Sequence, residues 1–185
     1  MSLFTYKVAT EPWEFEQIHE LNYRTFVEEI PQHPPNPERK LVDKFHEQNT
    51  YIICLYEQRV IGMITIRDQR PFSLDAKLDN LDQYLPPAKS ICELRLFVID
   101  PAHRKGKIMY GLLVKGAQIG LAREYDLAIM SGTTRQLKMY KAFGYVPIGP
   151  LVGKPGAMYQ PMYITRETLT QRAPWLERLL ERAKS

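Results

Sequence analysis

Hydrophobic and polar residues follow one another in short runs, which predicts several strands separated by a few helices. Residues 4–9 alternate as a strand does. Residues 50–56 and 60–67 are apolar runs joined by a tight turn, so they predict a hairpin. Further strand-like runs follow at residues 90–99, 127–131, 145–148 and 157–164.

Helical spacing of apolar residues marks the segments between these strands. Phe15, Ile18 and Leu21 predict a helix that is capped by Thr10 or Glu11 and ends before Pro31. Further helices are expected at 38–48, 104–124, 134–143 (ended by Gly144) and from Thr165 onward. The resulting order of elements predicts an α/β or α+β sheet with helices on both faces.

Two irregular stretches interrupt this pattern. Residues 32–37 read QHPPNP, which predicts a surface loop. Residues 68–87 form a longer connection, with one helical turn expected near 78–84. Long connections inside a domain are more often functional than idle. No linker is visible, so the expectation is one domain over residues 1–185, with residues 164–185 as a helical tail.

Composition narrows the classes of function. The net charge of +4 over 185 residues lacks the dense basic stripe of a nucleic-acid binder, but it suits a small anionic ligand or an acidic partner. No signal peptide and no membrane span are visible. Cys54 and Cys92 are expected to be buried thiols, which predicts a reducing compartment, the cytoplasm. The four histidines lack metal-ligand spacing, so no metal is expected.

Residues 92–121 predict a strand, a positively charged turn and a long helix. The turn carries His103, Arg104, Lys105, Gly106 and Lys107. A helix that begins there presents free N–H groups and the positive end of its dipole, which suits a phosphate or diphosphate. The alternative is an ordinary turn with surface lysines.

This order of elements, with LRLFVIDPAHRKGK before the long helix and YKAFGY at residues 140–145, resembles the GNAT acyltransferase superfamily. The resemblance covers residues 4–164. It implies an α/β fold with a mixed, mostly antiparallel central sheet of six to seven strands, splayed in the middle, and helices on both faces.

The resemblance also implies a binding segment for acetyl-CoA or another acyl-CoA. Its strand would bulge and offer backbone groups to the pantetheine arm, and its turn would bind the diphosphate. The residues implied are Leu96, Phe97, Val98, Arg104, Lys105, Gly106, Lys107, Ile108 and Met109. The chain departs from the family's R/Q-x-x-G-x-G/A pattern, because Lys107 and Met109 stand where small residues are usual.

Other segments, among them PQHPPN, RDQRPFSLD and SGTTRQLKMYKAFGY, resemble a divergent GNAT-like branch. This branch is related to N-acyl amino acid synthases and acyl-homoserine-lactone synthases, which often take longer acyl chains from acyl carrier protein. Those enzymes keep a Glu and an Arg close together, as Glu93 and Arg95 are here, although the spacing differs by one.

Acyl transfer to an amine needs an acid for the leaving thiolate and a base for the ammonium. By resemblance Tyr140 is the candidate acid, and the alternative is a core aromatic residue. Glu93 is the candidate base. Residues two apart in a strand face the same side, about 6–7 Å apart, so Arg95 could either neutralise Glu93 in a structural ion pair or bind a substrate carboxylate.

The acceptor pocket is expected to draw on the two loops and the end of one strand. The candidates are Arg70, Phe72, Ser131 and His33, beside Arg95. We therefore expect an N-acyltransferase that moves an acyl group, by superfamily frequency acetyl, directly from CoA to the primary amine of a small molecule. The alternatives are a synthase of N-acyl amino acids or lactones fed by acyl carrier protein, and a GNAT-fold binding domain without catalysis. A homodimer is compatible with each.

Overall fold

The computed structural model describes residues 3–104 and 106–174. The chain divides into two compact units, each built from two separate stretches. Unit 1 holds Met1–Ile66 and Leu96–Gly116, and unit 2 holds Arg67–Arg95 and Ala117–Ser185. Strand β4 (Ile91–Ile99) and helix α2 (Lys107–Ala122) each contribute residues to both units.

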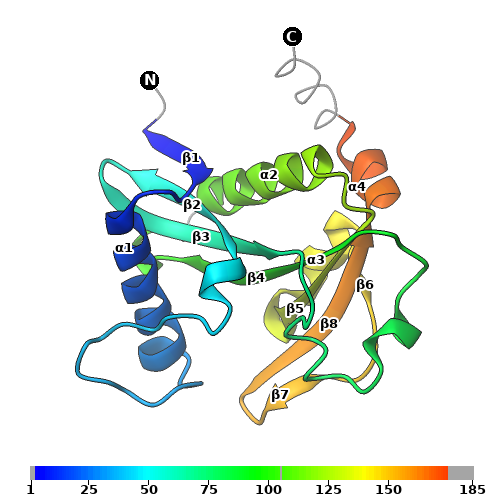
Figure 1. Cartoon of the computed structure of the whole chain (residues 1–185), viewed down its shortest axis with the longest axis horizontal. Helices are drawn as coiled ribbons and strands as arrows, with labels where there is room; N and C mark the ends of the chain where they lie inside the picture. Colours follow the sequence, from blue (N-terminus) through cyan, green and yellow to red (C-terminus); the bar gives the residue numbers. More distant parts are fainter. Residues whose placement is uncertain (1–2, 105, 175–185) are drawn as a thin grey trace. The chain divides into compact units, whose positions relative to one another are not determined.

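Unit 1 is built on an antiparallel sheet. Strand β1 (Phe4–Val8) pairs with β2 (Thr50–Tyr56), which pairs with β3 (Arg59–Arg67). The predicted hairpin is confirmed, and its turn holds Glu57 in the left-handed region with φ 54°. The strands appear in blue and cyan in Figure 1.

Helix α1 (Pro12–Tyr23) begins with the predicted cap. The Glu11 side chain and the Glu14 side chain form a reciprocal capping box, and a proline stands in the first turn. The helix continues as a π-helical segment, Arg24–Glu29, which ends when the Ile30 N–H donates to the Thr25 carbonyl at 2.8 Å. The predicted end before Pro31 is therefore confirmed.

The two helices of unit 1 use opposite faces of the hairpin, because side chains alternate along a strand. Ile18 and Leu21 of α1 pack with Ile53 and Met63 in one core cluster. On the other face, Gly62 lets α2 approach so closely that an added Cβ would lie 3.2 Å from Leu112. The predicted placement of helices on both faces is confirmed here.

The helix expected over residues 38–48 is wrong. This segment is irregular and holds only a 3-10 turn, His46–Gln48. Arg39 adopts φ 51°, which a helix does not allow. The Asn36 side chain binds both the N–H and the carbonyl of Lys40, so these backbone groups are satisfied outside a helix.

Unit 2 holds the rest of the sheet. The first half of β4 runs parallel to β5 (Leu127–Thr133), with Ile91 opposite Leu127 and Leu94 opposite Met130. Strand β8 (Ala157–Thr165) pairs antiparallel with β5 and also with two short strands, β6 (Val146–Pro147) and β7 (Val152–Lys154). Figure 1 shows β5, β8 and β6 side by side.

Short helical segments connect the strands of unit 2. They are the 3-10 turns Leu81–Tyr84 and Thr134–Gln136, helix α3 (Leu137–Phe143) and helix α4 (Arg166–Arg172). Gly144 ends α3 in the left-handed conformation, φ 99°, as predicted. The tail helix expected from Thr165 onward is present as α4, and residues 175–185 lie outside the described part of the chain.

The hydrogen-bonded strand order is β1-β2-β3-β4-β5-β8-β6, with β7 paired to β8. Among the described residues β4 and β5 run parallel, whereas β1–β2, β2–β3, β5–β8, β6–β8 and β7–β8 are antiparallel pairs, so the predicted mixed, mostly antiparallel α/β sheet is confirmed. The described residues form eight strands, more than the six to seven expected, and β7 is a short hairpin partner of β8. Among the described helices, none has the length and apolarity that crossing a membrane would require.

Candidate active site

Tyr140 lies on α3 and is almost completely buried, with 4% of its surface exposed. Its hydroxyl donates to the Gln136 side-chain carbonyl at 3.1 Å, one helical turn earlier. Burial raises the pKa of Tyr140 to about 12. The phenol therefore stays protonated at neutral pH, which is the state that an acid needs.

The Tyr140 ring is held by close packing in unit 2. It shares a core cluster with Met130 and Met162, against which Leu94 packs. The ring also lies over Gly132, where an added Cβ would come within 2.5 Å of it. A glycine at that position of β5 is therefore required by the placement of the ring.

Glu93 lies in β4 and is fully buried, with 0% of its surface exposed. Its carboxylate accepts hydrogen bonds from the Ser73 N–H at 2.7 Å, the Ser73 hydroxyl at 2.5 Å and the Leu74 N–H at 3.1 Å. Glu93 thus holds the start of the long connection between β3 and β4. Sequence reasoning missed this role, because the two partners are about twenty positions away and carry no charge.

Arg95 faces the same side as Glu93, as the spacing in the strand predicted. Its Nε lies 3.6 Å from a Glu93 carboxylate oxygen, and 12% of the Arg95 side chain is exposed. The geometry supports the structural ion pair that the sequence left open. The role of Glu93 as a base and the role of Arg95 in binding a carboxylate stay predictions.

Glu93 and Tyr140 lie on opposite faces of the β4–β5 sheet. Glu93 is opposite Ile129 in the parallel register, and Ile129 packs with Leu74 in one core cluster. Leu94, the next residue, is opposite Met130 and packs on the side of Tyr140. Because adjacent residues of a strand point to opposite faces, the two candidate groups approach the sheet from different sides.

The acceptor candidates in unit 2 have defined neighbours. Arg70 pairs with Asp75 at 2.5 Å and with Asp82, and its guanidinium stacks 5.3 Å from the centre of the Phe72 ring. Phe72 itself is 3% exposed and belongs to the hydrophobic core of unit 2. The Arg70 side chain is therefore held at the protein surface by its two acidic partners, whereas Phe72 fixes the loop to the hydrophobic core of unit 2.

Ser131 and His33 are the remaining acceptor candidates. The Ser131 hydroxyl lies 3.5 Å from the Lys77 ammonium group. His33 belongs to unit 1, where its side chain is exposed and its backbone N–H donates to the Phe26 carbonyl at 3.2 Å.

The segment expected to bind the donor lies in unit 1. Leu96 adopts φ 49°, a left-handed conformation that is rare in a leucine, in the part of β4 where a bulge is expected. The side chains of Leu96 and Val98 pack in the core of unit 1. Phe97 is partly exposed between them.

The turn after β4 is a 3-10 turn, Pro101–His103, capped by Asp100, whose carboxylate accepts from the Ala102 N–H at 3.0 Å. Gly106 and Lys107 are exposed where α2 begins. Ile108 is buried and Met109 is partly exposed. Lys105 lies outside the described residues.

Arg104 has a partner that the sequence did not reveal. Its Nε donates to the Ile99 carbonyl at 3.0 Å, and its two terminal nitrogens bind both carboxylate oxygens of Glu29, one of them at 2.6 Å. This contact holds the pKa of Glu29 below its usual range. Unit 2 thus holds a buried phenol and a buried carboxylate, and unit 1, described by itself, holds a charged turn.

Comparison with known proteins adds a family. The model of the family described as N-acyl amino acid synthase FeeM matches residues 17–166. No curated protein matches the chain. Among solved structures, the CoA-dependent acyl-homoserine lactone synthase BjaI with SAM and isopentyl-CoA is 20% identical, with a TM-score of 0.73 over 88% of this chain and 82% of that one.

Two further structures are similar. FeeM, an N-acyl amino acid synthase from uncultured soil microbes, is 14% identical, with a TM-score of 0.70 over 91% of this chain and 94% of that one. MesI, a CoA-dependent acyl-homoserine lactone synthase, is 16% identical, with a TM-score of 0.73 over 94% of this chain and 95% of that one. At these identities the likeness concerns the fold, which is the one predicted from the GNAT resemblance.

Proposed function

Because the chain belongs to the family of N-acyl amino acid synthase FeeM, a family of N-acyltransferases, we propose that it transfers an acyl group from a thioester to the amine of an amino acid. The observation that carries this proposal is the family match over residues 17–166, which includes both Glu93 and Tyr140. It supports an amino acid as the acceptor, within the wider class of small primary amines expected from the sequence.

We propose a direct transfer without a covalent enzyme intermediate. The neutral amine attacks the thioester carbonyl and forms the C–N bond. The C–S bond then breaks, so the acyl group stays on nitrogen and the thiolate departs. Tyr140 gives its proton to the departing thiolate, and its phenolate takes back the surplus proton of the new amide nitrogen. The phenol is protonated at neutral pH, so its proton is available to the thiolate, and burial makes it a weaker acid than an ordinary phenol.

Glu93 is the candidate to take the proton whose loss turns the substrate's ammonium group into the neutral amine that attacks. Its position on the face of the sheet opposite to Tyr140 weighs against this role, because an acid and a base must both reach the same reacting atoms. Its three hydrogen bonds to Ser73 and Leu74 support the competing role, in which Glu93 positions the loop that carries Arg70. Arg95 and Arg70 are the candidates for the carboxylate of the amino acid.

We propose acyl-CoA as the donor, bound by the bulged segment Leu96–Val98 and by the turn that ends at Arg104. The side chains of Lys107 and Met109 keep the diphosphate farther from the backbone than glycines would. In this proposal Lys107 attracts the diphosphate by its charge. Acetyl was the expected acyl group from superfamily frequency. Acetyl-CoA and a long-chain acyl-CoA are therefore both donors in the transfer assay.

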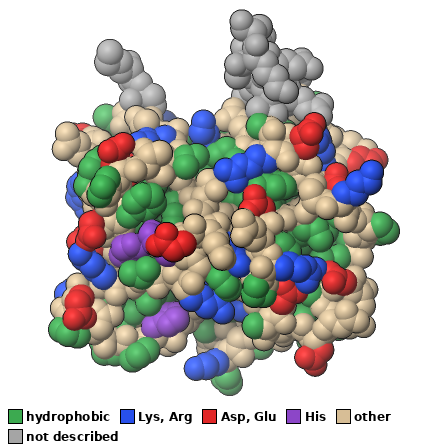
Figure 2. Space-filling model, in the orientation of Figure 1, with side chains coloured by type: hydrophobic (Ala, Val, Ile, Leu, Met, Phe, Trp, Pro, Cys, Tyr) green, Lys and Arg blue, Asp and Glu red, His purple; other side chains and the backbone are tan. Residues whose placement is uncertain are grey.

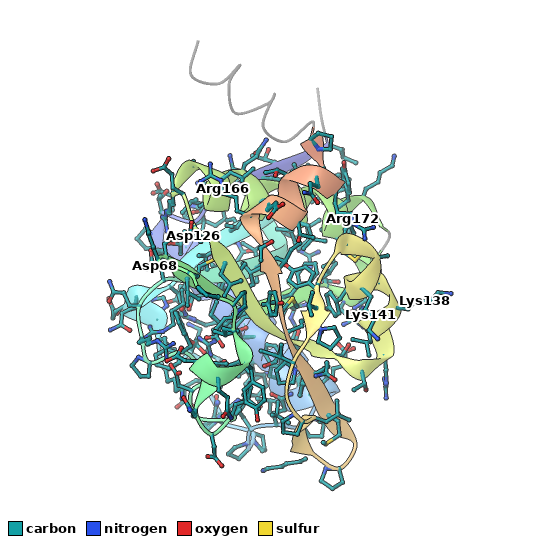
Figure 3. All side chains as sticks on the ribbon, turned by 90° about the vertical axis from the view of Figure 1, so that its right-hand side faces the viewer. Asp68, Asp126, Lys138, Lys141, Arg166 and Arg172 are labelled. Carbon is teal, nitrogen blue, oxygen red and sulfur yellow. The ribbon has the colours of Figure 1, made fainter. Side chains whose placement is uncertain are left out.

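A carrier protein as donor is the second candidate, and a basic surface favours it. Lys138 and Lys141 are exposed on α3, and Arg172 is exposed on α4. Gly144, the residue that ends α3, lies beside α4, because an added Cβ there would lie 3.5 Å from the Arg172 side chain. Figure 3 shows these three residues on one side of unit 2. An acidic carrier protein would find complementary charge there.

We propose that residues 1–185 work as one acyltransferase domain and that the protein acts in the cytoplasm. Cys54 and Cys92 are free and buried, which supports a reducing compartment. Acidic and basic side chains are interspersed on the face drawn in Figure 2, which does not favour nucleic acid as a partner.

The test is a transfer assay with purified protein and a mixture of amino acids. The donors are acetyl-CoA, a long-chain acyl-CoA and the same long acyl group on acyl carrier protein, and mass spectrometry detects N-acyl amino acids. Product from either CoA thioester supports the main proposal, and product from the carrier protein alone supports the second candidate. If no donor yields an acylated amine, the chain is a binding domain and the proposal fails.

A further inference from the structure

The turn expected to take the donor's diphosphate already holds an anion of the protein itself. Arg104 presents the planar fork of its guanidinium group to Glu29, and both terminal nitrogens are engaged by the two carboxylate oxygens. The Arg104 side chain is 44% exposed and that of Glu29 is 38% exposed. The pair is therefore open to water and to a ligand.

The contact with Glu29 is one of two that tie the same segment to the turn. Arg24, at the start of the π-helical segment, donates to the Asp100 carboxylate at 3.0 Å. Glu29, at the end of the segment, binds Arg104. The π-helical segment therefore contacts both ends of the turn, through a cation at Asp100 and an anion at Arg104. The two contacting residues of the segment are five positions apart.

Carboxylate and phosphate oxygens compete for the same part of a guanidinium group, because both bind its fork in a bidentate manner. Nε of Arg104 already donates to the Ile99 carbonyl, so the pair of donors left for a bidentate anion is the two terminal nitrogens. These are the nitrogens that bind Glu29. A diphosphate that binds Arg104 in this way must displace Glu29 or accept the repulsion of its carboxylate.

We propose that Glu29 is a donor-selectivity residue, which weakens the binding of thioesters that bring a diphosphate to Arg104. The inference rests on the proposed function, in which this turn faces the diphosphate of CoA. A thioester on pantetheine alone brings no diphosphate, so Glu29 leaves its use unchanged. Glu29 thereby shifts the enzyme away from CoA and toward donors that are recognised by their acyl-pantetheine part.

The test compares the wild type with Glu29→Gln, which keeps the shape of the side chain and removes its charge. Glu28→Gln is the matched control, because Glu28 is the adjacent acid and pairs with Arg39 instead. Calorimetric titration measures the Kd of CoA, and an assay measures kcat/KM with acyl-CoA and with the same acyl group on pantetheine. Thermal unfolding verifies that each variant is folded.

We expect Glu29→Gln to bind CoA about 1.5-fold to fivefold more tightly and to gain the same factor in kcat/KM with acyl-CoA, which is the range for one exposed ion pair. The pantetheine thioester and Glu28→Gln should show no change. In an Arg104→Gln background the effect of Glu29→Gln should vanish, because its target is gone.

Unchanged or weaker binding of CoA by Glu29→Gln overturns the proposal, and weaker binding would mean that Glu29 orients Arg104 for the donor. Equal gains with acyl-CoA and acyl-pantetheine also overturn it. Failure of the proposed function has a different signature, since the wild type would then transfer from no thioester while the calorimetric comparison of CoA binding still decides the role of Glu29.

Discussion

Glu93 and Tyr140 approach the β4–β5 sheet from opposite faces, Glu93 beside the Ile129 side chain and Tyr140 beside Met130. Each candidate group therefore has its own set of neighbours. A substitution at one should leave the packing of the other intact, so their contributions to stability and to chemistry can be measured separately.

Glu93→Gln should destabilise the protein by about 2–3 kcal/mol, because hydrogen bonds to a buried charged group are among the stronger ones. The Glu93 carboxylate accepts hydrogen bonds from the Ser73 and Leu74 N–H groups. In the variant, the NH2 of the glutamine amide would face one of these donors and could not accept from it. Urea unfolding measures the change. Asp79→Asn, an exposed acid in the same connection, is the control and should have no effect.

Kinetics of the same Glu93 variant separate the base from the loop anchor. A base predicts a large fall in kcat with little change in KM. An anchor predicts a raised KM that Ser73→Ala reproduces in part, because that variant removes the hydroxyl bound to Glu93 at 2.5 Å. A Glu93→Gln protein as stable as the wild type would contradict the anchoring role.

Tyr140→Phe should lower kcat by about 10²–10⁴-fold if the phenol donates the proton, while the stability falls only by the one hydrogen bond to Gln136, about 1 kcal/mol. Tyr145→Phe is the matched control, since its ring lies 6.1 Å from that of Tyr140. Equal rates for Tyr140→Phe and the wild type would remove Tyr140 from the chemistry.

The pH dependence of kcat tests the protonation state of Tyr140. The acid is active below its pKa, which burial raises to about 12. We therefore expect no loss of kcat from ionisation of this phenol up to about pH 10, where a phenol of ordinary pKa is half ionised. A basic limb near pH 10 that disappears in Tyr140→Phe would contradict the effect of burial.

Gly132→Ala should disturb the Tyr140 ring, because the new Cβ would lie 2.5 Å from a ring carbon and 3.0 Å from the Met162 methyl group. Overpacking of a buried site costs about 1–3 kcal/mol, and kcat should fall with it. Gly120→Ala in α2 is the control. Its nearest neighbour would be Tyr125 at 3.8 Å, so the helix should gain about 0.5–1 kcal/mol.

His19 should make stability depend on pH. Its ring is 7% exposed and lies 4.8 Å from that of His46, and burial, followed by His46, lowers its pKa. Lys40 acts in the same direction and Glu16 opposes it. The folded state thus prefers neutral His19, so its contribution is complete above the unfolded pKa of about 6.5 and is lost as the pH falls through the lower folded pKa.

The measurement is urea unfolding from about pH 8 to about pH 5, a range above the titration of ordinary carboxylates. His19→Phe should flatten the dependence, whereas replacement of the exposed His33 by Gln should preserve it. An equal slope in wild type and His19→Phe would show that His19 does not carry the effect.

Elements whose causes are local could be predicted from the sequence. The capping box of Glu11 and Glu14 and the left-handed Gly144 each depend on a few neighbouring residues. The segment at 38–48 has helical composition, but the Asn36 side chain captures backbone groups of Lys40, and this capture overrides propensity.

In the candidate site, the sequence predicted which residue types are present and which of them share a face of a strand, but it did not predict their partners. The shared face of Glu93 and Arg95 follows from the period of a strand. The bond of Arg104 to Glu29 joins residues 75 positions apart, and each of them alone is an ordinary surface charge. No local pattern distinguishes such a pair before the fold brings the two together.

The division of the chain has a consequence for protein synthesis. Each unit needs two stretches that alternate along the sequence, so unit 1 cannot be completed until Gly116 has left the ribosome, and residues 67–95 must wait for the segments after Ala117. A nascent chain therefore carries an unfinished sheet for most of its elongation. For the same reason, a cut between β3 and β4 would leave two fragments, neither of which holds an entire unit.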